Sequence, residues 1–211
     1  MSLDLAKLHR WIVAELGRGR PIEKSMSALI DKCEKSRPHV DWSKLRELPY
    51  SDLQPLEDWI RRVFSKGRSR RPLKGLWFGL FNPCPDGRHP VAEIYVCGSD
   101  RFDPDPEDNS WAVGPKWWPK GRYAESKILA DLYRISYRQR AGASAQKDCL
   151  GNDAEYPLCL GYGLFAVKKL LEKMEPALIL GKSDSIGVAV GFDSGDFVLV
   201  GRMTKDGLLA F

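Results

Sequence analysis

The sequence predicts an α+β fold: N-terminal helices followed by a mainly antiparallel sheet built from hairpins, with two further helices packed on it. Three observations support this prediction. In residues 1–70, apolar residues recur every three or four positions, which is the period of amphipathic helices. After residue 75, apolar and small or polar residues alternate around turn sequences, as in hairpins. Two helical segments, one amphipathic and one almost wholly apolar, separate the first hairpin from the last strands.

Three helices are expected in the N-terminal part. The first spans residues 3–16 and ends at Gly17, and its apolar stripe is Leu5, Leu8, Ile12 and Leu16. Pro21 begins the second, because a proline in the first turn of a helix loses no hydrogen bond there. Prolines break the segment that follows into turns. A third helix ends at Gly67 and carries Leu56, Trp59, Ile60, Val63 and Phe64.

Strands are expected near residues 75–81 and 91–97, on either side of a turn that contains Pro-Asp-Gly. A helix is expected over residues 123–139, and an apolar helix is expected to begin at Pro157. In the strand near residues 186–192, glycine and alanine alternate with bulky residues, so one face is nearly bare. Because a bare face allows close approach, we expect the apolar helix to lie on that strand. The sequences "DSGD" and "KDG" predict two more turns and a short last strand.

The length of 211 residues fits one domain, with a helical part (1–70) and a sheet-containing part (71–211). The five cysteines are odd in number and scattered, which predicts a reducing, cytoplasmic setting and a fold without disulfides. No apolar run approaches the roughly 20 residues that span a bilayer, so no membrane association is expected. The net charge of +5 divides into +7 for residues 1–75 and −2 for residues 76–211.

The sequence shows no established catalytic, metal or cofactor motif. It contains no H-E-x-x-H, no G-x-S-x-G and no glycine-rich phosphate loop, and its histidines are isolated: His9, His39 and His89. We therefore expect no cofactor and no metal. An enzyme whose site is assembled from distant positions, around Asp193, Asp196 or Cys84, remains an open alternative.

The segment "DNSWAVGPKWWPKGRY" at residues 108–123 places Trp111, Trp117 and Trp118 in an expected loop. These tryptophans either fill the edge of a core or anchor a partner. Trp117 and Trp118 are adjacent, so in an extended segment their rings point to opposite sides. The loop follows a run of acidic residues that resembles a calcium loop but lacks its glycine and its final glutamate: Asp103, Asp105, Glu107 and Asp108.

The leading hypothesis from this acidic and aromatic loop is a soluble protein that binds another protein. A bacterial immunity-type protein that neutralises a basic toxin or effector has this profile. The alternative is a nucleic-acid-associated module that uses the basic stretch 61–74, whose density of cations is suited to phosphates. Its cationic residues are Arg61, Arg62, Lys66, Arg68, Arg70, Arg71 and Lys74.

Overall fold

The computed structural model describes residues 3–67, 69–81, 92–105, 107–138, 149–193 and 195–211, and within them the α+β prediction is confirmed. The helices of the N-terminal part are α1 (Leu5–Gly17), α2 (Ile22–Ser36), α3 (Trp42–Arg46) and α4 (Gln54–Lys66). They are followed by β1 (Gly75–Phe81), β2 (Glu93–Ser99), a 3₁₀ turn η1 (Ser110–Ala112) and β3 (Tyr123–Glu125). The remaining elements are α5 (Lys127–Ser136), α6 (Asn152–Lys173), α7 (Pro176–Leu180), β4 (Ile186–Phe192), β5 (Phe197–Thr204) and β6 (Gly207–Leu209).

The sheet has the strand order β3-β2-β1-β4-β5-β6. Four of its five pairings are antiparallel, and β1 pairs with β4 in parallel at its centre. The expected first hairpin is confirmed by the pairing of Gly75 with Ser99 through Phe81 with Glu93, although its turn lies outside the described residues. The two expected turns near the C-terminus join β4 to β5 and β5 to β6.

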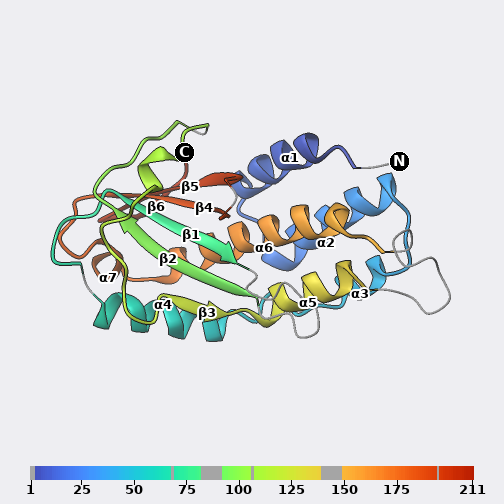
Figure 1. Cartoon of the computed structure of the whole chain (residues 1–211), viewed down its shortest axis with the longest axis horizontal. Coiled ribbons are helices and arrows are strands. Elements are labelled where there is room, and N and C mark those ends of the chain that lie inside the picture. Colours follow the sequence, from blue (N-terminus) through green and yellow to red (C-terminus); the bar gives the residue numbers. More distant parts are fainter. Residues whose placement is uncertain (1–2, 68, 82–91, 106, 139–148, 194) are drawn as a thin grey trace.

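The sheet fills one half of an elongated molecule, and α1, α2, α3 and α5 fill the other (Figure 1). Helix α6 runs from the helical half to the sheet, where it contacts β1, β4 and β5. The main core cluster includes residues from the first helix to β5, so the parts 1–70 and 71–211 share it. No helix in the described part of the chain combines the length and the apolar character needed to cross a bilayer.

Three local predictions about the helices were wrong. Residues 123–125 form β3 instead of a helix, because they pair with residues 93–95 of β2. Helix α5 begins only at Lys127, with Ser126 as its N-cap. Helix α6 begins at Asn152, five residues before Pro157, which lies inside it. The proline-rich segment between α2 and α4 contains the short helix α3, whose Trp42 is fully buried.

The expected packing of α6 on β4 is confirmed, but α6 covers the bulky face of that strand instead of the bare one. The bulky residues of β4 belong to the main core with α6, and Gly163 of α6 faces Leu80 of β1. The bare face is covered by aromatic rings instead. A Cβ atom on Gly187 would lie 2.2 Å from the ring of Phe102, and one on Gly75 would lie 2.5 Å from the ring of Trp111. The small residues therefore make room for a second layer of aromatic rings, here called the aromatic layer, on the face of the sheet opposite α6. This layer includes Trp77, Phe102 and Trp111.

Candidate binding site

The loop at residues 108–123 uses its three tryptophans in three different environments. Trp111 is buried on the small-residue face of the sheet, with its ring against those of Trp77 and Phe102. Trp117 is buried in the main core beside Phe64. Trp118 is exposed over 52% of its surface. The adjacent pair thus has one buried and one exposed ring, as an extended segment predicts.

Trp117 joins the loop to the end of α4. Its indole Nε1 donates a hydrogen bond to the carbonyl of Gly67, with the two atoms 2.6 Å apart. Its backbone forms a bridge with Gly98 at the end of β2. Because Gly67 follows the end of α4 and lies within the basic stretch 61–74, these contacts hold the tryptophan loop directly beside that stretch.

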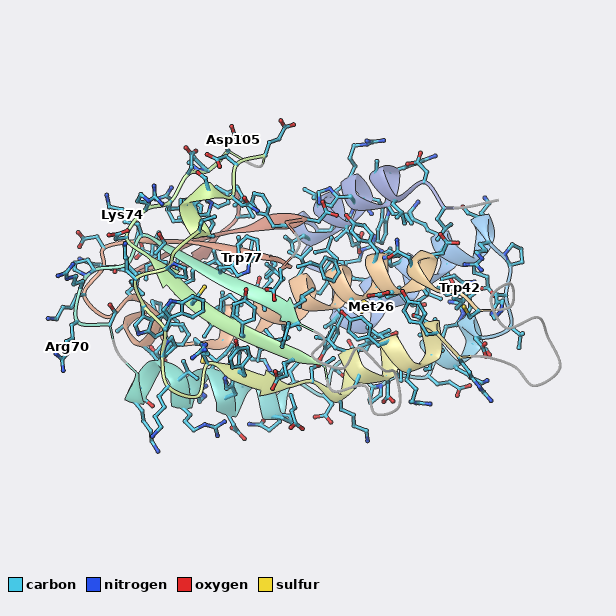
Figure 2. All side chains as sticks on the ribbon, viewed as in Figure 1. Met26, Trp42, Arg70, Lys74, Trp77 and Asp105 are labelled. Carbon is cyan, nitrogen blue, oxygen red and sulfur yellow. The ribbon has the colours of Figure 1, made fainter. Side chains whose placement is uncertain are left out.

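The two segments together line a pocket of about 440 Å³. The wall that comes from the basic stretch includes Lys66, Arg70 and Arg71, and the wall from the loop includes Lys116, Trp118 and Lys120. Asp100 is the one carboxylate among the described lining residues. The sequence presents these segments as two separate candidates, and the structure brings them together. Figure 2 shows the side chain of Arg70 at the end of the molecule where the pocket lies.

The cations of this basic pocket are not neutralised by the described part of the protein. Within the described ranges, none of Lys66, Arg70, Arg71, Lys116 and Lys120 forms an ion pair. A sixth cation lies close by, since the ammonium group of Lys182 donates to the carbonyl of Arg70 at 3.3 Å. Like charges gathered without counterions attract anions to a concave surface.

The other residues of the basic stretch lie elsewhere. Arg61 is paired with Glu57 on α4 at 3.0 Å, and Arg62 is exposed on the same helix. Lys74 is exposed at the start of β1 without lining the pocket. Arg68 lies outside the described residues.

The acidic residues of the loop make local turns. The carboxylates of Asp103 and Asp105 each accept the backbone N–H two residues later, at 3.0 and 2.9 Å. Asp108 accepts from the N–H and the hydroxyl of Ser110, and these hydrogen bonds lower its pKa. Glu107 is exposed. The described residues contain no cluster of three or more histidine, cysteine or carboxylate side chains that could hold a metal ion.

A second, smaller pocket of about 150 Å³ lies on the aromatic layer, and Trp118 lines it as well. Its other rings are Trp77, Tyr95 and Phe192, and its polar groups include Asp193 and Asn109. Sequence reasoning did not single out Tyr95 or Asn109, because their partners in this pocket are distant in the chain.

The hydroxyl of Tyr95 and the thiol of Cys97 in this aromatic pocket both have raised pKa values. The hydroxyl of Tyr95 donates to Oδ1 of Asp193 at 2.6 Å. Burial and this hydrogen bond raise the pKa of Tyr95, so the hydroxyl stays a donor. Burial raises the pKa of the Cys97 thiol, which also lines the pocket, to about 12. A thiol with that pKa is not a nucleophile near neutral pH.

Of the other residues named for a dispersed active site, Asp196 does not line this pocket. Asp196 lies beside Tyr156, whose pKa burial raises to about 12 with a smaller contribution from that carboxylate. Cys84 lies outside the described residues.

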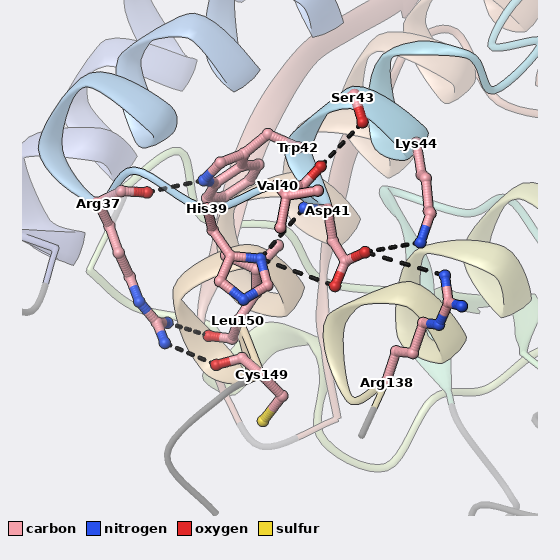
Figure 3. A network of polar contacts seen from close by, with 10 residues as sticks. All are labelled: Arg37, His39, Val40, Asp41, Trp42, Ser43, Lys44, Arg138, Cys149 and Leu150. Carbon is pink, nitrogen blue, oxygen red and sulfur yellow. Dashed lines mark hydrogen bonds and ion pairs between the residues drawn. The ribbon is translucent and has the colours of Figure 1, made fainter. Parts of the chain in front are cut away.

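A polar network at the opposite end of the molecule joins α2 to the start of α6 (Figure 3). The guanidinium of Arg37 donates to the carbonyls of Cys149 and Leu150 and pairs with Asp153. The carbonyl of Arg37 in turn accepts from Nε1 of Trp42 at 2.7 Å. Arg37 thus connects the end of α2 to the backbone just before α6 and satisfies carbonyl groups there, so we assign this network to stabilisation of the fold.

Comparisons of the chain with protein-family models, with curated proteins and with solved structures found no match.

Proposed function

We propose that the protein binds single-stranded nucleic acid, with phosphates in the basic pocket and a base stacked on Trp118. The observation that carries this proposal is the meeting, in a single pocket, of one exposed tryptophan ring and five cations that form no ion pair with any described residue. A positively charged groove beside an aromatic platform is the combination that binds single strands without reading sequence.

The charges account for affinity and the ring accounts for the preference for unpaired bases. Each phosphate that a cation neutralises releases counterions from the strand, which favours binding at low salt. The guanidinium of Arg122 lies 5.2 Å from the centre of the Trp118 ring, on one face of it. A base would stack on the opposite face, and stacking requires a base that is not paired within a duplex.

The hypothesis of a protein that neutralises a basic toxin or effector stays a prediction. Its acidic residues Asp103, Asp105 and Glu107 are exposed. Two of its three expected anchors, Trp111 and Trp117, are buried, however, and the third lies among cations that repel a basic partner. A reducing, cytoplasmic setting fits the nucleic-acid proposal, and the described cysteines are free thiols.

Fluorescence anisotropy with a labelled oligo-dT of about 12 nucleotides tests this proposal, since single-strand modules cover about 4–16 nucleotides. The double variant Lys116→Ala/Lys120→Ala removes two pocket cations. Its matched control, Lys24→Ala/Lys35→Ala, removes two exposed lysines from α2 in the other half of the molecule.

The pocket variant is expected to lower the slope of log affinity against log salt by about 1.4, which is about 0.7 for each phosphate that is no longer neutralised. The control is expected to leave that slope unchanged. Trp118→Ala is expected to weaken binding by about 1–3 kcal/mol, the contribution of one stacked base. Equal effects of both lysine pairs, or equal binding of a duplex of the same length, would contradict the proposal.

A further inference from the structure

We infer that the aromatic pocket beside Trp118 is a subsite for one base, and that Asp193 makes this subsite selective for guanine. The inference rests on the proposed binding of a nucleic-acid strand and adds a base preference to it. It starts from the position of Trp118, which lines both the basic pocket and the aromatic pocket. A nucleotide carries its base and its phosphate on one sugar, so a single nucleotide can place one group in each pocket.

The aromatic pocket has the size and lining for a planar ring. Its volume is about 150 Å³, and an apolar cavity on the order of 150 Å³ holds benzene. Trp77, Tyr95, Phe192 and Trp118 supply aromatic surface from β1, β2, β4 and the loop. Aromatic rings prefer offset or edge-to-face contact with one another, and a base offers both a face and an edge.

Charge separates what enters the two pockets. Among the described residues, one carboxylate and five cations line the basic pocket, whereas Asp193 and no lysine or arginine line the aromatic pocket. The guanidinium of Arg122 lies over the Trp118 ring but does not line the aromatic pocket. A phosphate is therefore attracted far more strongly to the basic pocket than to the aromatic pocket. The group that enters the aromatic pocket is the uncharged base.

Asp193 is exposed directly after β4, and the hydrogen bond from Tyr95 orients its carboxylate at the pocket. The hydroxyl of Tyr95 occupies one acceptor position of Oδ1, and no described residue donates to Oδ2. An ionised carboxylate offers about four acceptor positions over its two oxygens. Most of the acceptor capacity of Asp193 thus remains for a ligand.

Guanine matches this acceptor better than the other bases. Its pairing edge presents two neighbouring donors, N1–H and the N2 amino group, which can meet the two oxygens of one carboxylate. Thymine and uracil present one N–H between two carbonyl oxygens, which a carboxylate repels. Adenine and cytosine present one amino group beside a ring nitrogen acceptor, so each can make only one such bond.

The test is a competition experiment in which unlabelled oligonucleotides displace labelled oligo-dT from the full chain. The competitors are oligo-dT and the same strand with one central dG or one central dA. The strand with dG is expected to compete at least about fivefold better than oligo-dT, the lower end of what a two-bond base contact supplies. The strand with dA is expected to stay within about twofold of oligo-dT.

Two variants separate recognition by Asp193 from general effects. Asp193→Asn replaces one acceptor by a donor, so it is expected to abolish the preference for dG and to favour dA, whose edge pairs with an amide. Asp206→Asn removes the same charge at the exposed turn between β5 and β6, and it is expected to keep the preference for dG. A third variant, Tyr95→Phe, removes the hydroxyl that positions Asp193 and is expected to reduce the preference.

The outcomes distinguish this inference from the function on which it rests. Binding of all three strands with equal affinity by the unchanged protein would overturn the guanine subsite and leave single-strand binding intact. A preference for dG that survives in Asp193→Asn would overturn the role of that carboxylate. Failure of every oligonucleotide to bind would overturn both proposals.

Discussion

Replacing Trp117 by alanine is expected to destabilise the protein strongly, whereas the same change at its neighbour Trp118 is expected to cost little. Trp117 is 7% exposed and packs against Phe64, with the ring centres 5.2 Å apart. Removing a buried aromatic side chain costs about 3–5 kcal/mol through reduced burial and the cavity that remains. The carbonyl of Gly67 also loses its hydrogen bond from Nε1, and a bond of this kind contributes about 0.5–1.5 kcal/mol.

Trp118 contributes much less to the folded state. Half of its surface is already in water, and the guanidinium of Arg122 lies 5.2 Å from the centre of its ring. Exposed cation–π contacts contribute about 0.5–1 kcal/mol. We therefore expect Trp118→Ala to lower the free energy of unfolding by about 1 kcal/mol. The conservative variant Trp117→Phe keeps a ring beside Phe64 and loses the hydrogen bond, so its cost is expected to lie between the two.

Urea unfolding followed by circular dichroism measures these differences. The urea concentration at the midpoint is expected to be highest for the natural protein and to decrease through Trp118→Ala and Trp117→Phe to Trp117→Ala. The slope of the free energy of unfolding against urea should be similar for all four proteins if folding stays two-state. For a chain of this size, each kcal/mol corresponds to about 2–4 °C in melting temperature. A decrease in Trp118→Ala as large as that in Trp117→Ala would refute the assignment of one ring to the core and one to the pocket.

Three further predictions concern stability. Gly187→Ala is expected to lower the free energy of unfolding in urea by about 1–3 kcal/mol, because its Cβ would overlap the ring of Phe102. The control Gly17→Ala, whose Cβ would meet no atom, is expected to stay within about 0.5 kcal/mol of the natural protein. Equal costs for the two variants would contradict the close packing at Gly187. Arg37→Ala is expected to cost about 1.5–3 kcal/mol in the same assay, since it removes a charged donor to two carbonyls and a carboxylate, and an unchanged midpoint would show that the network does not hold α6. Burial raises the pKa of Cys97 from 9.0 to about 12, so the thiol favours the folded state fully below pH 9, and this stabilisation is lost between pH 9 and 12 because the unfolded thiol ionises there first. The free energy of unfolding, measured from about pH 8 to 11, should therefore decline less steeply in Cys97→Ala than in the natural protein. An identical decline in both proteins would argue against this linkage.

The parts of the fold that depend on local pattern could be predicted from the sequence. The stripe of α1 is confirmed by the burial of Leu8, Ile12 and Leu16, because a helix that packs on one side buries residues at that spacing. Strand β3 could not be predicted in this way. Tyr123–Glu125 is too short to show a period, and it becomes a strand because β2 offers it an edge.

The candidate site could be predicted only in pieces. The basic stretch and the tryptophan loop are each visible in the sequence, but their meeting depends on contacts from Trp117 to Gly67 and Gly98, which no spacing indicates. The exposure of Trp118 follows from the burial of its neighbour once the segment is extended. The bond from Tyr95 to Asp193 joins residues that are 98 positions apart and has no sequence signal.

The parallel pairing of β1 with β4 has a consequence for the nascent chain. Gly75 pairs with Gly187, so the ribosome must deliver everything between them before the centre of the sheet can close. Until then β2 can protect one edge of β1, while the other edge presents unpaired N–H and carbonyl groups beside the apolar residues Leu76, Phe78 and Leu80. Open strand edges of this kind recruit other chains. A nascent chain that stalls before residue 186 is therefore expected to be prone to aggregation. Chaperones must prevent this aggregation, because the strand that would cover the open edge is not yet synthesised.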